Sequence, residues 1–189
     1  MPSRLPFRIL LISGSLRSRS TNTAALRTAQ VVAPPGLVTV LYDELADLPA
    51  FNPDDDVIPL HTVVARLRAA IHAADALLFS TPEYAGALPG SFKNLLDWTI
   101  GDEQPGSIYE KPVAWINVAL RGADDAHDSL RKVLGFAHAN IIEAACVHIP
   151  VTAEMIGADA LIGDLSARRA IAKALATLAA SASPFPDND

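Results

Sequence analysis

The chain has 189 residues, of which 50% are hydrophobic and 19% charged, a composition that excludes an intrinsically disordered chain, a collagen-like chain and a coiled coil. With 15 basic and 21 acidic residues the net charge is −6, and no basic cluster occurs, so we do not expect a nucleic-acid partner. The single cysteine excludes an internal disulfide framework and fits a cytoplasmic location. We expect no signal peptide and no membrane helix, since no apolar run reaches the roughly 18 residues that such a helix needs.

Five short apolar runs predict the strands of a parallel sheet. Each run is nearly continuous and rich in Val, Ile or Leu, which is typical of strands that are buried on both faces. The predicted strands are Phe7–Ser13, Leu37–Tyr42, Ala76–Ser80, Val113–Ala119 and Ile141–Val147. The last of these contains Cys146, which we predict to be an inert thiol in a central strand of the core.

Five segments with apolar side chains at helical spacing alternate with these strands. They are Thr23–Ala33, Leu60–Ala73, Pro89–Ile100, Asp128–Ala139 and Ser166–Ala180. Because strand and helix alternate and parallel crossovers are right-handed, the sequence predicts an α/β fold, a three-layer sandwich around a five-stranded parallel sheet in the order 2-1-3-4-5. We expect a single domain over residues 1–189, with 7–180 as its core and 181–189 as a tail.

One long connection inside this core has no predicted helix. It runs from Asp43 to Pro59, and connections of this length tend to be functional. Its acidic run, Asp54–Asp56, lacks the spacing, the glycine and the glutamate of a calcium loop, and the five histidines have no metal-binding spacing. We therefore expect a functional loop here and no metal site.

Ligands of a doubly wound sheet bind beyond the carboxyl ends of the strands, where the strand order reverses. For the predicted order this point lies between the first and third strands. The loops to consider are therefore 13–22 and 81–86.

The first of these loops predicts a phosphate site. It contains four serines, a threonine, an asparagine and two arginines, and it leads into a helix whose first N–H groups are unpaired. Leu16 occupies the place of the second glycine of a dinucleotide fingerprint, and no Gly-Lys pair of a P-loop occurs, so a terminal monophosphate is the expected ligand. An ordinary capping turn with Ser20 or Thr21 as the N-cap is the alternative.

The second loop predicts a surface for a planar heterocycle. Pro82 stiffens the strand exit, Gly86 allows a ligand to approach the main chain, and Tyr84 offers a flat amphipathic ring. A stiff connector with a tyrosine in the core would have the same features, and this alternative stays open.

Together these loops resemble the NAD(P)H-dependent FMN reductase family, which is flavodoxin-like and includes quinone, azo and chromate reductases. The first motif is Gly14-Ser15-Leu16-Arg17-x-x-Ser20-x-Asn22. The second is Pro82-Glu83-Tyr84 followed by Pro89-Gly90-x-x-Lys93-Asn94-x-x-Asp97-Trp98, and the stretch Asp47-Leu48-Pro49-x-Phe51-Asn52-Pro53-Asp54 is also similar. The resemblance covers the chain from about Phe7 to Leu178.

The resemblance implies an FMN cofactor and NAD(P)H as co-substrate. The residues implied to hold the phosphate are Ser15, Arg17, Ser20 and Asn22. Those implied to border the isoalloxazine are Pro82, Glu83, Tyr84, Ala85 and Gly86. Similar proteins often have Asn in place of Ala85, and a glycine-rich turn where residues 117–125 contain only Gly122. Arg19 and Arg121 are candidates to contact the 2′-phosphate of NADPH.

On helix 89–100 the resemblance implies that Asn94, Asp97 and Trp98 shape the helix and a dimer contact. The apolar side chains Phe92, Leu95, Leu96 and Ile100 suit either a dimer contact or the core.

We therefore expect an NAD(P)H-dependent FMN reductase. The hydride would pass from the nicotinamide through FMN to a small acceptor, such as a flavin or a quinone, in ping-pong order and without a catalytic side chain. We expect the protein to form a homodimer or homotetramer in the cytoplasm and to have no nucleic-acid or membrane partner. A flavodoxin-like electron carrier and a non-catalytic module for a phosphate ligand are the alternatives.

Overall fold

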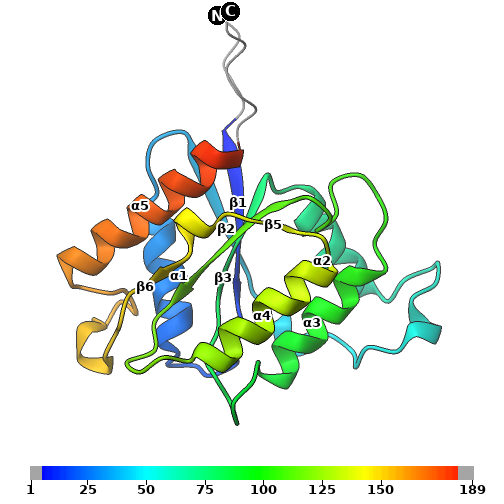
Figure 1. The fold of residues 1–189 in the computed structure, drawn as a ribbon, viewed down its shortest axis with the longest axis horizontal. Helices are drawn as coiled ribbons and strands as arrows, with labels where there is room; N and C mark the ends of the chain where they lie inside the picture. Colours follow the sequence, from blue (N-terminus) through cyan, green and yellow to red (C-terminus); the bar gives the residue numbers. More distant parts are fainter. Residues whose placement is uncertain (1–5, 183–189) are drawn as a thin grey trace, which may run out of the picture.

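A parallel sheet forms the middle layer of the protein in this computed structural model, which describes residues 6–182 (Figure 1). Its order, β2-β1-β3-β4-β5, confirms the prediction. The short strand β6 also pairs with β4, farther along β4 than β5 does. The strands are β1 Phe7–Ser13, β2 Leu37–Tyr42, β3 Ala76–Ser80, β4 Pro112–Asn117, β5 Asn140–Ile141 and β6 Val147–His148. Of the predicted tail, only residues 181 and 182 lie within the described part.

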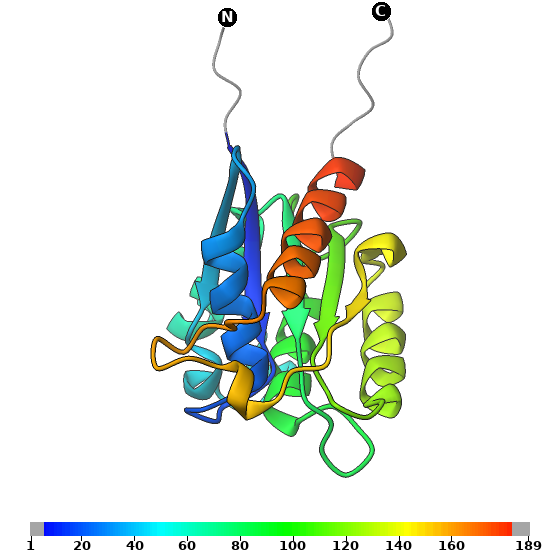
Figure 2. The ribbon, with the colours of Figure 1, turned by 90° about the vertical axis from the view of Figure 1, so that its left-hand side faces the viewer.

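Helices cover both faces of this sheet (Figures 1 and 2). On one face lie α1 Thr21–Val32 and α5 Leu165–Ala182, and on the other lie α2 Thr62–His72, α3 Gly90–Ile100 and α4 Asp124–Phe136. Successive side chains of a strand point to opposite faces, so Ile9 and Leu11 pack against α1 and α5 while Leu10 and Ile12 pack against the other three helices. The three layers are those that the sequence predicts.

The predicted fifth strand is wrong as a continuous element. A 3₁₀ turn, η3 Glu143–Ala145, separates β5 from β6. Glu143 is charged and sits at the edge of the sheet, so the turn leaves its carboxylate exposed, where it pairs with Arg131 of α4. Cys146 consequently lies at this edge and is half-buried, not in a central strand as predicted, and its burial raises the pKa of the thiol to about 11.

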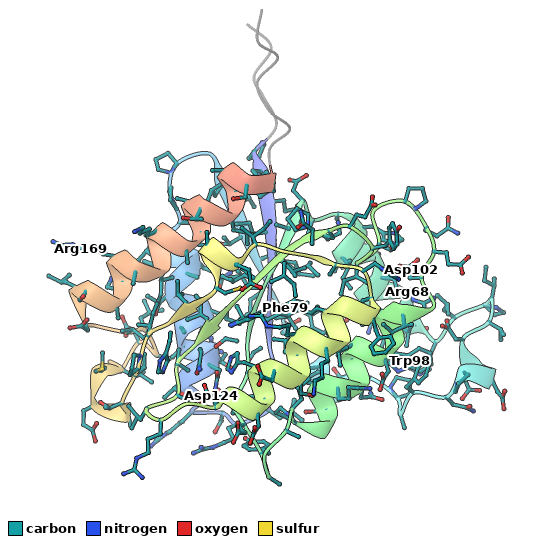
Figure 3. All side chains as sticks on the ribbon, viewed as in Figure 1. Arg68, Phe79, Trp98, Asp102, Asp124 and Arg169 are labelled. Carbon is teal, nitrogen blue, oxygen red and sulfur yellow. The ribbon has the colours of Figure 1, made fainter. Side chains whose placement is uncertain are left out.

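The long connection after β2 is tied to the helices beside it. It contains the 3₁₀ turns η1 Leu45–Asp47 and η2 Pro53–Asp55. Asn94 Nδ2 and Trp98 Nε1 of α3 both donate to the Pro49 carbonyl at 2.9 Å. The Arg68 guanidinium of α2 donates to the Asp56 carboxylate at 2.8 Å and to the Trp98 carbonyl, and Figure 3 shows Arg68 and Trp98 close together.

The prediction that this is the only long connection without a helix inside the chain is wrong. Residues 142–164 also contain no α-helix, and they carry the chain from β5 to α5. Within residues 6–182, none of the helices has the length and apolar character that a membrane span requires.

Candidate functional site

A cavity of about 330 Å³ lies where the strand order reverses, at the carboxyl ends of β1, β3 and β4. We call it the switch-point pocket. Its lining residues are Thr21, Asn22, Thr81, Pro82, Glu83, Val118, Ala119, Arg121 and Ala123. Three loops contribute to it, and two of them are the loops that the sequence singles out.

The loop after β1 is shaped by its own serines. Ser15 is buried, and its hydroxyl accepts a hydrogen bond from the Arg17 backbone N–H at 3.3 Å. Ser20 is the N-cap of α1 and accepts from the Thr23 N–H at 3.3 Å. The Arg17 side chain is exposed and makes no hydrogen bond or ion pair with residues 6–182. The capping turn is therefore present, and it holds a loop in which Arg17 is free to bind an anion.

Two buried contacts join this loop to β3. The Ser80 hydroxyl lies 2.9 Å from the Asn22 side-chain amide and donates to the Ile116 carbonyl at 2.8 Å, so Asn22 is held against β3 and β4. Gly14 passes so close to β3 that a Cβ there would lie 2.3 Å from Thr81 Oγ1 and 2.9 Å from a ring carbon of Phe92. Gly14 therefore permits the two loops to meet at the pocket.

The loop after β3 forms a tight turn that projects beyond the sheet (Figure 2). Tyr84 and Ala87 exchange two backbone hydrogen bonds, at 3.0 and 3.1 Å. Between them, Ala85 has φ +51° and Gly86 has φ +71°, the pattern of a type I′ turn. Tyr84 is 46% exposed, so the alternative of a tyrosine in the core is wrong.

Glu83 connects this loop to α4. Its carboxylate accepts a hydrogen bond from the Ala126 N–H at 3.1 Å. The N-cap of α4 is Ala123, which has no side-chain oxygen to offer and adopts φ +57°. Glu83 therefore supplies the cap that α4 lacks locally, and its negative charge is favourable at a helix N-terminus.

Polar side chains hold the loop after β4 in place of a glycine-rich turn. Asn117 Nδ2 donates to the Gly122 carbonyl at 2.6 Å, and its Oδ1 accepts from the Ala119 N–H at 2.9 Å. His148 donates to the Ala119 carbonyl and His127 to the Ala123 carbonyl, both at 2.7 Å. Both carbonyls belong to residues that line the switch-point pocket.

His127 stays neutral in this arrangement. Burial lowers the pKa of its imidazole, an effect only partly offset by the hydrogen bond to Ala123. Its Nδ1 carries the proton that the carbonyl accepts, so Nε2 presents a lone pair, and this atom is buried without a partner in the described part of the chain.

The structure separates the predicted site residues into three groups. Asn22, Pro82 and Glu83 line the cavity itself. Ser15 and Ser20 shape its first loop, and Arg17, Tyr84, Ala85 and Gly86 are exposed and are not among its lining residues. Thr21, Thr81, Val118, Ala119 and Ala123 line the cavity but were not predicted. Thr21 is an unspecified position inside the first motif and Thr81 precedes the second, whereas the loop after β4 is indicated only by the resemblance, through residues 117–125 and Arg121.

Comparison with known proteins gives consistent results. The model of the family "NADPH-dependent FMN reductase" matches residues 7–154. An NAD(P)H-dependent FMN reductase of Pseudomonas aeruginosa is 36% identical over 172 residues, 90% of this chain and 92% of that protein. A quinone reductase of Pseudomonas putida is 32% identical over 162 residues, 84% of this chain and 82% of that protein.

A solved structure shares the fold along nearly the whole chain. It is FerB, a flavoenzyme NAD(P)H:(acceptor) oxidoreductase from Paracoccus denitrificans, with a TM-score of 0.80 and 27% identity. The match covers 93% of this chain and 97% of FerB.

Proposed function

This chain belongs to the NADPH-dependent FMN reductase family, and we propose that the switch-point pocket is the place where it holds its flavin. It is a flavin-dependent NAD(P)H oxidoreductase with FMN as cofactor and NAD(P)H as co-substrate. FMN, when bound, supplies the hydride chemistry, and the protein supplies binding and orientation.

The donor set of the first loop fits the phosphate of FMN. The Arg17 side chain makes no hydrogen bond or ion pair within residues 6–182, and the buried Ser15 and Ser20 fix the loop from which it extends. An arginine hydrogen bond to an anion contributes roughly 1.5–3 kcal/mol, and exposed charges are screened beyond about 8 Å, so the net charge of −6 does not prevent phosphate binding. In this proposal Ser15, Arg17, Ser20 and Asn22 form the phosphate site.

The second loop fits the edge of the isoalloxazine through its main chain. The Glu83 carboxylate accepts from the Ala126 N–H and the main chain of Tyr84 is bonded to Ala87, so the main-chain groups of Glu83, Ala85 and Gly86 are those left for a ligand. The Tyr84 ring is exposed, next in sequence to the lining residue Glu83, and offers a flat surface. The loop after β4, through Ala119 and Arg121, forms the opposite wall.

We propose that NAD(P)H and the acceptor use this one pocket in turn, which is a ping-pong order. Relatives named as FMN reductase and quinone reductase support a flavin or a quinone as the acceptor. Residues 7–180 serve as one FMN-binding domain in this proposal, in a homodimer or homotetramer in the cytoplasm. Phe92, Leu95 and Leu96 lie in the core and are not available for a dimer contact, whereas Ile100 is exposed.

A visible absorption spectrum tests this function. Purified protein is mixed with FMN, and the spectrum is taken before and after anaerobic NADPH and, separately, NADH. A bound-flavin spectrum that bleaches is the expected result. A bound flavin that neither nucleotide bleaches would favour the electron carrier, and a protein that binds no flavin would favour the non-catalytic module.

A further inference from the structure

A second cavity, of about 400 Å³, adjoins the switch-point pocket at the start of α1. Residues of the first loop and of α1 form one wall, and the segment 153–160 that leads toward α5 forms the other. Thr21 lines both cavities, so the two share a wall at the first residue of α1. We call this second cavity the arginine pocket.

Two arginines give the pocket its charge. Arg19 and Arg27 line it, both are exposed, and neither makes an ion pair or a side-chain hydrogen bond with residues 6–182. No Asp or Glu is among the lining residues, although the chain has 21 acidic residues. By contrast, Arg66, Arg68 and Arg131 each pair with a carboxylate. Two free guanidinium groups with no acidic neighbour in the lining are suited to a phosphate monoester.

The rest of the lining suits a flat and largely apolar group. Ile156 and four alanines line the pocket, and such small side chains leave room for a ring. The outer segment is fixed in place, because the Ile162 N–H donates to Thr28 Oγ1 of α1 at 2.9 Å and the Gly157 N–H donates to the Leu161 carbonyl at 2.9 Å. The pocket therefore combines phosphate-binding groups with a rigid wall for a planar base.

We propose that the arginine pocket binds the 2′-phosphoadenosine end of NADPH and so makes the enzyme prefer NADPH to NADH. This rests on the proposed function, because the nicotinamide end would then occupy the switch-point pocket. The sequence marks Arg19 and Arg121 as candidates for the 2′-phosphate, and the structure places them in different cavities. Only Arg19 is accompanied in its cavity by a second arginine, Arg27.

Direct binding tests the proposal without relying on turnover. Calorimetric titration compares adenosine 2′,5′-bisphosphate with adenosine 5′-monophosphate, which differs only by the 2′-phosphate. We expect the wild-type chain to bind the bisphosphate more tightly. Arg27→Gln and Arg19→Gln should each weaken bisphosphate binding roughly 10- to 100-fold, the loss expected for a charged hydrogen bond. Arg169→Gln, an exposed arginine on α5, is the matched control (Figure 3).

The same variants have a kinetic readout. The ratio of kcat/KM for NADPH to that for NADH should fall by a similar factor in Arg27→Gln and stay at the wild-type value in Arg169→Gln. Equal affinity of the wild-type chain for the two adenosine nucleotides would overturn the proposal, as would an Arg27→Gln chain that binds the bisphosphate as well as the wild type.

One further outcome separates the two sources of a phosphate monoester. If Arg27→Gln weakens FMN binding and leaves bisphosphate binding intact, the pocket serves the flavin phosphate and the proposal is overturned. Failure of the proposed function would look different, because the wild-type protein would then not bind flavin, or neither nucleotide would bleach it.

Discussion

The long connection after β2 and the short loop after β4 both leave the carboxyl edge of the sheet, but their contacts differ. The long connection is bonded to α2 and α3 through Arg68, Asn94 and Trp98, and none of its residues lines the switch-point pocket. The short loop is held by Asn117, His127 and His148 from outside the pocket, and its opposite side forms the pocket wall. The length of a loop is thus a poorer guide to function than its distance from the point where the strand order reverses.

The largest effect is expected where the long connection is anchored. Arg68→Ala should lower the free energy of unfolding by about 3 kcal/mol, because it leaves the Asp56 carboxylate and the Trp98 carbonyl without a partner in a largely buried place. Denaturant unfolding measures the change, and the folded variant should bind FMN with wild-type affinity. The control is Arg66→Ala on the same helix as Arg68. It removes an exposed ion pair with Glu44 and should change stability little. A large loss of FMN affinity in Arg68→Ala would assign the long connection a functional role.

The opposite behaviour is expected from Arg17. Arg17→Ala should weaken FMN binding roughly 10- to 100-fold, because it removes a charged hydrogen bond to the phosphate, and it should leave stability unchanged, since the exposed side chain makes no hydrogen bond or ion pair with residues 6–182. Quenching of flavin fluorescence gives the dissociation constant. Arg169→Ala controls for the loss of one positive charge, and an unchanged affinity in Arg17→Ala would remove Arg17 from the phosphate site.

Substitution of Glu83, which joins the loop after β3 to α4, should have a smaller effect on stability. Glu83→Ala removes the oxygen that accepts from the Ala126 N–H and should cost about 1 kcal/mol of unfolding free energy, the usual loss for a helix cap. Glu83→Gln retains an oxygen acceptor and should lose less. Equal stability of the two variants would show that Glu83 does not stabilise the protein through its hydrogen bond to α4.

The smallest effect is a gain in stability at the projecting turn. Ala85 adopts φ +51°, where Asn is far more readily accommodated than Ala, so Ala85→Asn should stabilise the protein by up to about 1 kcal/mol. Thermal unfolding of the variant and the wild type measures this change in stability. Ala87→Asn at the end of the same turn is the control, because Ala87 is not among the residues with positive φ. Destabilisation by Ala85→Asn would show that the turn conformation is not what limits stability there.

Several elements follow from local sequence pattern alone. Continuous apolar runs identify β1, β2 and β3 with their observed bounds, because strands of a parallel sheet that is covered on both faces are dominated by apolar residues. Helical periodicity places all five helices, and the rule for doubly wound sheets then indicates where the switch-point pocket lies.

Other features depend on partners far away in the chain. The start of α4 is predicted at Asp128 but observed at Asp124, because its cap comes from Glu83, 43 residues earlier. The break between β5 and β6 likewise depends on the pairing of Glu143 with Arg131 at the sheet edge.

The sequence by itself therefore determined the order of strands and helices, the three-layer arrangement, and the loops that meet at the switch point. Periodicity and the handedness of crossovers are local or topological properties, and a single sequence carries them. Only the tertiary structure decided that the long connection is an anchored segment, and that Arg19 and Arg27 share a cavity with residues 153–160. Each of these depends on contacts between segments that only folding brings together, and no spacing along the chain encodes them.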